Sequence, residues 1–82
     1  SYQLVHSIIE GIEQNTLLIQ LESYKKGSIL LQYDYESQKF ENIGKFSLGK
    51  IVGMDKDNIF YYSNNEISKV PINSIGKVFK QK

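Results

Sequence analysis

The stretch that decides the fold reads Ile51-Val52-Gly53-Met54-Asp55-Lys56-Asp57-Asn58-Ile59-Phe60-Tyr61-Tyr62. Apolar and aromatic residues that favour β-strands flank its polar centre. The central Asp55-Lys56-Asp57-Asn58 contains residue types whose side chains hydrogen-bond to their own backbone and tolerate turn geometry. The stretch therefore predicts a β-hairpin, in which two strands are joined by a tight turn.

Length and composition are those of one small globular domain. The chain has 82 residues, of which 40% are hydrophobic and 23% are charged, so neither a second domain nor disorder is expected. We therefore treat residues 1–82 as a single domain. No apolar run is long enough to cross a bilayer. No signal peptide is visible, and this favours a cytoplasmic location.

Several residue types are absent, and their absence limits the chemistry. Without cysteine there is no disulfide, no thiolate zinc site and no cysteine nucleophile. Arginine, tryptophan and alanine are also missing, so all ten basic residues are lysine. The lack of alanine, together with many β-branched and aromatic residues, favours strands over helices.

The first segment of the chain allows two interpretations. Leu4, Val5, Ile8, Ile9 and Ile12 fit one face of a helix, whereas alternate residues from Tyr2 to Ile8 fit a strand. The helical spacing fits slightly better. We therefore expect a short amphipathic helix that ends near Gly11, with a strand as the alternative.

The rest of the chain reads as a series of strands. Leu17–Leu21 is a short apolar run that suits a strand covered on both faces. A strand over Phe40–Phe46 would place Phe40, Asn42, Gly44 and Phe46 on one face. Asn64 and Asn65 suit a primed hairpin turn, and a last strand is expected over Ile75–Lys80. Seven or so closely spaced strands predict an all-β antiparallel fold.

A family resemblance is carried by two stretches, Gly49-Lys50-Ile51-Val52-Gly53-Met54-Asp55 and Val70-Pro71-Ile72-Asn73-Ser74-Ile75. They resemble the later strands of small SH3-like and Sm-like β-barrels, including the PRC-barrel type. This resemblance implies a small antiparallel barrel. Sm-like proteins bind RNA through an Asp-to-Asn loop and an Arg-Gly turn. Here Asp55 and Asn58 lie one residue closer together than in that loop, and the chain has no arginine.

A second resemblance starts from an internal echo. Ile9-Glu10-Gly11-Ile12-Glu13-Gln14-Asn15-Thr16-Leu17-Leu18 has the same order of residue types as the stretch that begins at Ile51, 42 residues later. This spacing is similar to the blade period of β-propellers. The alternative fold is therefore two propeller-like four-stranded blades. Two blades cannot close a propeller, so this alternative implies a fragment of a larger or oligomeric protein.

Residues that could carry catalysis or bind metal are few. His6 is the only histidine, and no neighbour in the sequence marks it as part of a catalytic or metal site. Asp55 and Asp57 share a turn, but the sequence after them lacks the remaining ligands of a calcium loop. We therefore expect no enzyme activity, no metal and no cofactor.

Tyrosines and lysines are the candidate binding residues. Tyr33 and Tyr35 are expected on one face of one strand, and Phe60 and Tyr62 on one face of another. The predicted binding surface consists of Tyr33, Tyr35, Lys45, Lys50, Tyr62, Lys69 and Lys77. Its expected role is contact with a protein partner or another copy of the chain, in a non-catalytic binding or assembly module. The alternative is single-stranded RNA or DNA binding, because aromatic rings flanked by lysines can stack bases.

Charge is divided unequally along the chain. Residues 1–44 carry three lysines and six acidic residues, and residues 45–82 carry seven lysines and three acidic residues. The net charges of the two halves are therefore −3 and +4. Such a dipole could steer an anionic partner or bring two copies together, although lysines also serve simply to solvate the outer faces of strands.

Overall fold

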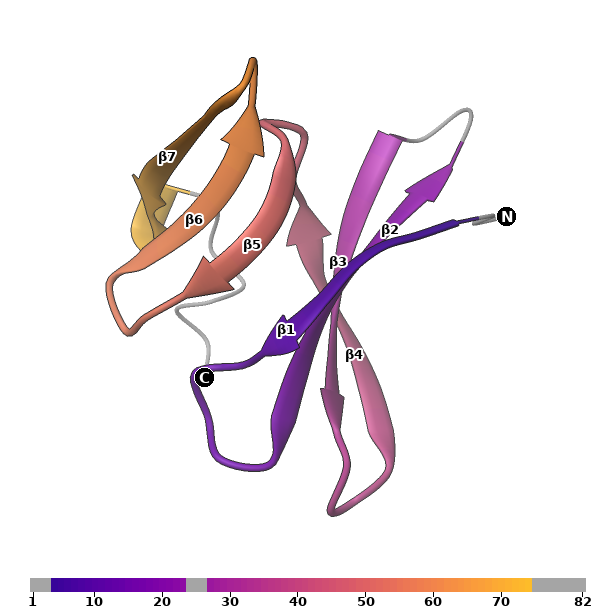
Figure 1. Ribbon diagram of the computed structural model, residues 1–82. Helices are drawn as coiled ribbons and strands as arrows, with labels where there is room; N and C mark the ends of the chain where they lie inside the picture. The colour runs from indigo at the N-terminus through magenta and orange to yellow at the C-terminus, as the bar shows by residue number, and fades with distance from the viewer. Residues whose placement is uncertain (1–3, 24–26, 75–82) are drawn as a thin grey trace.

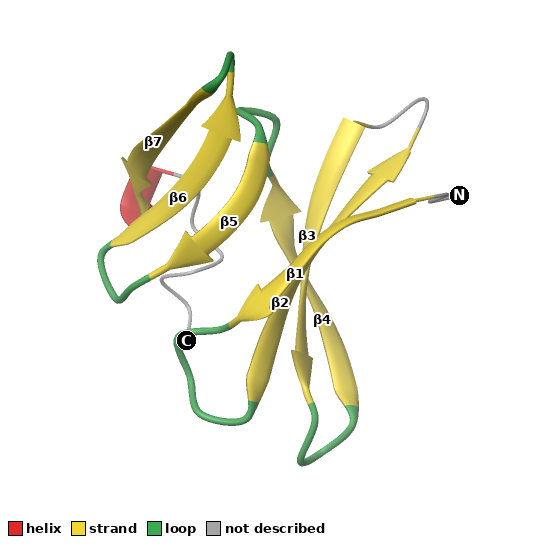
Figure 2. Cartoon of the chain, in the orientation of Figure 1, coloured by secondary structure: helices red, strands yellow, loops and turns green. Residues whose placement is uncertain are grey.

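The computed structural model describes residues 4–23 and 27–74, and this part of the chain is almost entirely β-structure (Figures 1 and 2). The elements are β1 (Leu4–Glu10), β2 (Thr16–Ser23), β3 (Gly27–Asp34), β4 (Lys39–Lys45), β5 (Lys50–Met54), β6 (Asn58–Ser63), β7 (Glu66–Pro71) and the 3₁₀ helix η1 (Ile72–Ser74). The predicted all-β class is confirmed. The expected strand over Ile75–Lys80 lies outside the described residues.

The strands form two antiparallel sheets, each a meander in which consecutive strands pair. The first sheet has the order β1-β2-β3-β4 and the second the order β5-β6-β7. Their first strands, β1 and β5, lie near each other. The strands of the described ranges do not close into a barrel, so the barrel expected from the sequence is not what these residues form.

The hairpin predicted at the start is present as β5 and β6. Asp55 closes its turn, because the carboxylate accepts hydrogen bonds from the backbone N–H groups of Asp57 and Asn58, both at 2.8 Å. These two bonds hold the pKa of Asp55 below its usual value. The ionised carboxylate is therefore the form that holds the turn at neutral pH.

The next turn also follows the sequence prediction. Asn64 and Asn65 join β6 to β7 with φ values of 53° and 65°. Two consecutive residues with positive φ define a primed turn, whose twist matches that of the flanking strands. Asparagine tolerates this conformation because its short polar side chain reduces the steric cost.

The predicted N-terminal helix is wrong, because Leu4–Glu10 forms β1 and pairs with β2. A bulge between Val5 and Ser7 shifts the register of this pair. One extra residue moves the following side chains to the other face, so the apolar spacing resembles a helical repeat. The β-branched Val5, Ile8 and Ile9 suit the extended conformation.

A second bulge changes the faces of β4. The register shifts opposite Leu30 and Leu31, and Gly44 next to the bulge has a φ of 132°, which favours glycine. Phe40 is consequently 62% exposed, whereas Phe46, beyond the bulge, is 3% exposed. The prediction that Phe40 and Phe46 share one face is therefore wrong.

The core lies between the two sheets. It is formed by Leu18, Leu30, Ile43, Phe46, Ile51, Ile59 and Ile72. We call the sheet faces that meet at this core the inner faces, and the opposite faces the outer faces. Phe46, in the connection between the sheets, packs edge-on against Tyr61 with the ring centroids 5.6 Å apart.

One polar side chain, Gln20 of β2, also lies in this interior and joins the sheets. Its amide group donates to the Gly49 carbonyl at 2.8 Å and accepts from the Ile51 N–H at 2.9 Å. The Ser7 hydroxyl donates to the same amide oxygen at 3.2 Å. Gln20 thus supplies the start of β5 with the donor and acceptor that a neighbouring strand would offer, and it protects this edge.

The glycine at position 49 lets the chain enter β5 close to β6. A Cβ atom at this position would collide with the Tyr62 carbonyl oxygen and crowd Ser63 and Tyr61. The absence of a side chain therefore permits the close approach that brings the Gly49 carbonyl to Gln20.

Candidate functional site

The candidate site is the outer face of the second sheet. Directly opposed residues of antiparallel strands project to the same side, and Ile59 and Tyr61 of β6 project towards the core. Their neighbours Phe60 and Tyr62 therefore project outward. We call this surface the lysine–tyrosine face, and it consists of Lys50, Val52, Phe60, Tyr62, Ile67 and Lys69.

Cross-strand pairing orders these side chains in two rows. Lys50, Tyr62 and Ile67 are register partners across β5, β6 and β7, and Phe60 is paired with Lys69 in the adjacent row. A bulge at Val52 adds another apolar side chain beside these rows. The face therefore combines an apolar and aromatic centre with lysines on β5 and β7.

Large apolar side chains on this face are open to solvent. Tyr62 is 44% exposed, Val52 43% and Ile67 62%. The Tyr62 hydroxyl donates to Asn65 Oδ1 at 3.1 Å, which orients the ring along the surface. An oriented tyrosine loses little conformational entropy when a partner binds.

The structure divides the predicted binding residues between the two sheets. Lys50, Tyr62 and Lys69 come together on the lysine–tyrosine face. Tyr33 lies on the first sheet and packs against Phe40, with 4.5 Å between the ring centroids. Lys45 is exposed at the end of β4, and Lys77 lies outside the described residues.

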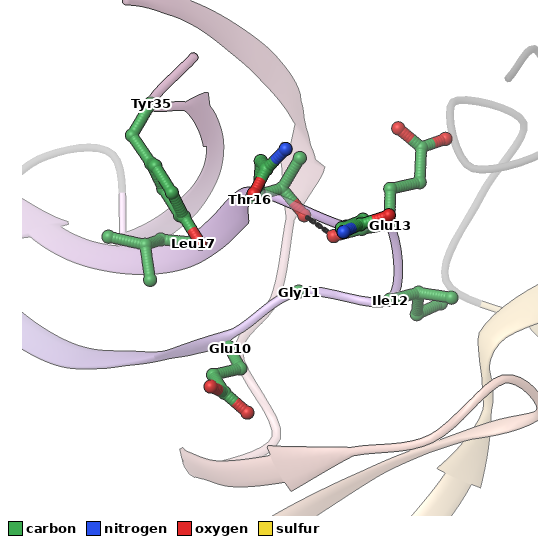
Figure 3. A pocket seen from close by; sticks show the side chains of 9 residues that line it. Glu10, Gly11, Ile12, Glu13, Thr16, Leu17 and Tyr35 are labelled. Atoms are coloured by element: carbon green, nitrogen blue, oxygen red, sulfur yellow. Dashed lines mark hydrogen bonds between the residues drawn. The ribbon is translucent and has the colours of Figure 1, made fainter.

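Tyr35 lies just beyond β3, at a shallow hollow of about 260 Å³ beside the β1–β2 turn. Its backbone N–H donates to the Asn15 carbonyl at 3.0 Å. Figure 3 shows its ring beside Leu17, with the carboxylates of Glu10 and Glu13 pointing away from each other. The acidic groups therefore do not converge on a common ligand position.

Sequence reasoning missed Val52 and Ile67 as surface residues. Successive side chains of a strand point to opposite faces, so an inward Ile59 places Phe60 and Tyr62 on the opposite side of the strand from Ile59 and Tyr61. Their partners on β5 and β7 then share the outward face. The bulge at Val52 was not readable from alternation, because one inserted residue reverses the faces on either side of it.

His6 has a carboxylate beside it. Its Nδ1 lies 3.5 Å from Glu22 Oε1, and both side chains border a hollow of about 210 Å³ that Ser28 and Ser47 also line. Within the described ranges, neither hydroxyl is hydrogen-bonded to the imidazole. A nucleophile activated by a base requires that contact, so the hollow lacks a formed catalytic pair.

Neither metal-binding clusters nor membrane-spanning helices occur among the described residues. In the described part of the chain, no three His, Asp or Glu side chains are grouped so that they could hold a metal ion. The same residues contain no helix with the length and apolar character needed to span a bilayer.

Comparison with models of known families, with curated proteins and with solved structures gives no match for this chain. Its class is therefore defined by architecture alone. The described chain is an all-β protein in which two antiparallel meanders pack around a shared core.

Proposed function

We propose that the protein is a non-catalytic binding or assembly module that contacts a protein partner, or another copy of itself, through the lysine–tyrosine face. The observation that carries the proposal is the group of exposed apolar and aromatic side chains on this face. Burying them would be favourable by roughly 25 cal/mol per Å² of apolar surface. Contiguous exposed apolar surface on a small protein commonly marks an interaction site.

The composition of the face also supports protein contact. Tyrosine and phenylalanine are enriched in the centres of protein interfaces, where a few aromatic anchors supply most of the binding energy. Tyr62 and Phe60 occupy such central positions on β6, with Lys50 and Lys69 on the two neighbouring strands. The lysines would lie at the rim and remain partly hydrated.

Site-specific photo-crosslinking in the native host tests this proposal. A benzoylphenylalanine replaces Ile67, which lies on the lysine–tyrosine face and is 62% exposed. We expect a discrete protein adduct after irradiation, because a bound partner would cover this position. Mass spectrometry of the adduct would then identify the bound protein.

The matched control carries the same photoreactive residue at Ser37, which is exposed in the turn between β3 and β4. We expect no discrete adduct from this position. Equal labelling from positions 37 and 67, or no adduct from position 67, would contradict the proposal.

A second candidate is single-stranded nucleic-acid binding by the same face. Phe60 and Tyr62 project to one side, and Lys50 and Lys69 are paired with them across the sheet. Such a platform can stack bases while lysines contact phosphates. The absence of arginine removes bidentate phosphate and guanine contacts, which is why we rank this function second.

An oligonucleotide titration at two salt concentrations separates these functions. Phosphate contacts release counterions, so the affinity of a nucleic-acid-binding protein falls steeply as salt increases. We expect no measurable binding near physiological salt. Tight binding that weakens with salt, and that is lost in the Tyr62→Ala variant, would favour the nucleic-acid function.

The propeller-like alternative is supported by the order of the strands. Each meander runs outward from its first strand, and the first strands β1 and β5 are neighbours. Propeller blades have this arrangement around their centre. Under this alternative the chain acts as an assembly unit that needs further copies or further repeats.

A further inference from the structure

The outer face of the first sheet carries large apolar side chains on all four of its strands. Ile8, Ile19 and Leu31 form one cross-strand row, which Asn42 completes on β4. Leu17, Tyr33 and Phe40 form the next row, which begins with Glu10 on β1. Ile8 is 56% exposed and Phe40 62%. Because the inner face of this sheet is already buried in the core, the outer face is a second apolar surface on a small molecule.

The 42-residue echo corresponds to two hairpins that close in the same way in the structure. The N–H of Gly11 donates to the Thr16 carbonyl at 2.9 Å, just as the N–H of Asp55 donates to the Asn58 carbonyl at 2.9 Å. Thr16 and Asn58 therefore occupy corresponding positions, although the first loop is two residues longer. The strands that follow, β2 and β6, also begin 42 residues apart.

With these positions matched, the two sheets contact each other through non-equivalent faces, an arrangement that we call head-to-tail. Leu18 of β2 is on an inner face, but its equivalent, Phe60 of β6, is on an outer face. The reverse holds for the outward Ile19 and its equivalent Tyr61, which packs against the core. The inner faces that meet at the core are therefore of two different kinds. Within the described residues, one face of each kind stays uncovered: the outer face of the first sheet and the lysine–tyrosine face.

We propose that a second copy of this chain seats its lysine–tyrosine face on the outer face of the first sheet. This contact would repeat the internal packing of the two sheets, because it joins the same two kinds of face. The inference rests on the proposed function, since it takes the lysine–tyrosine face as a contact surface and specifies its partner. The resulting interface is heterologous, so it builds rings or open chains.

Charge favours the same arrangement. The lysine–tyrosine face carries Lys50 and Lys69, whereas the outer face of the first sheet carries Glu10 opposite Leu17. Head-to-tail docking brings these lysines of one copy to the face of the next copy that carries Glu10. Docking of two identical faces would instead bring like charges together.

Sedimentation velocity on two face-specific variants tests the inference. Ile8→Lys alters the outer face of the first sheet, and Ile67→Lys alters the lysine–tyrosine face. We expect the wild-type chain to gain mass with concentration, and each variant to associate at least about tenfold more weakly, because a lysine would enter an apolar contact. An equimolar mixture should form a 1:1 dimer, since each variant retains the face that the other lacks.

The design contains its own controls. Both variants introduce lysine, so their altered faces repel each other and cannot restore binding. Ser37→Lys changes the charge outside both faces and should associate like the wild-type chain. Circular dichroism checks folding, and Val5→Lys with Val52→Lys, at positions 58% and 43% exposed, provides a second pair if either variant unfolds.

Two outcomes would overturn the inference. One is a wild-type chain that stays monomeric at every concentration. The other is association of the wild-type chain without dimer formation in the mixture, which would indicate contact between identical faces. If the chain stays monomeric while the photo-crosslink at position 67 captures a different protein, this inference fails and the proposed function stands.

Discussion

Replacing Gln20 with leucine is expected to lower the free energy of unfolding by about 2 to 4 kcal/mol. The side chain is 1% exposed, and its amide satisfies the Gly49 carbonyl and the Ile51 N–H. Leucine preserves the approximate volume but leaves both backbone groups without their partner. Urea unfolding followed by circular dichroism measures the change.

The matched control is Gln32→Leu on β3. Gln32 is half-buried, and within the described ranges its amide makes no hydrogen bond. We expect its effect on unfolding free energy to stay within about 0.5 kcal/mol. Equal effects of the two substitutions would show that the Gln20 amide does not hold the sheets together.

Replacing Ile59 with alanine is expected to destabilise the protein by about 2 to 5 kcal/mol. Ile59 is 0% exposed and lies in the core that both sheets share. The substitution removes apolar contacts and leaves a cavity that the surrounding strands fill only in part. Thermal and urea unfolding at a concentration where the chain is monomeric would measure the loss.

Ile67→Ala provides the comparison on the opposite face of the same sheet. Ile67 is 62% exposed on the neighbouring strand β7, so its replacement should change monomer stability by less than about 0.5 kcal/mol. The same substitution should weaken association. A large loss of monomer stability with Ile67→Ala would place this side chain in the fold rather than in an interface.

The local elements follow closely from the sequence, because their causes are local. The hairpin at Asp55 and the turn at Asn64 and Asn65 are present as predicted. In each case the side chains of the turn residues favour the observed backbone conformation over extended structure. The all-β class follows in the same way from many β-branched and aromatic residues and from short spacings between turns.

Elements that depend on a bulge were predicted incorrectly. β1 was expected to be a helix, and Phe40 and Phe46 of the β4 region were expected to share a face. A bulge inserts one residue opposite a single partner, so it exists only in relation to the paired strand. The apolar pattern of a single strand therefore does not reveal where a bulge will form.

The candidate site was only partly readable from the sequence. Lys50, Tyr62 and Lys69 were among the predicted residues, and the structure brings them together through the register of β5, β6 and β7. Tyr33 and Tyr35 were predicted on the same grounds, but Tyr33 lies on the first sheet and Tyr35 lies just beyond β3. Residue types identify binding candidates, whereas strand pairing decides which of them share a surface.

The sequence by itself determined the strands after β1, the turns and their order, because these depend on residues that are adjacent or nearly adjacent. Only the tertiary structure decided which face of each sheet is covered. Both Leu17 and Leu18 of β2 are apolar, so alternation cannot choose between them, and the inner face even contains the polar Gln20. Packing against the second sheet makes the choice, because Gln20 finds its hydrogen-bond partners only at the start of β5.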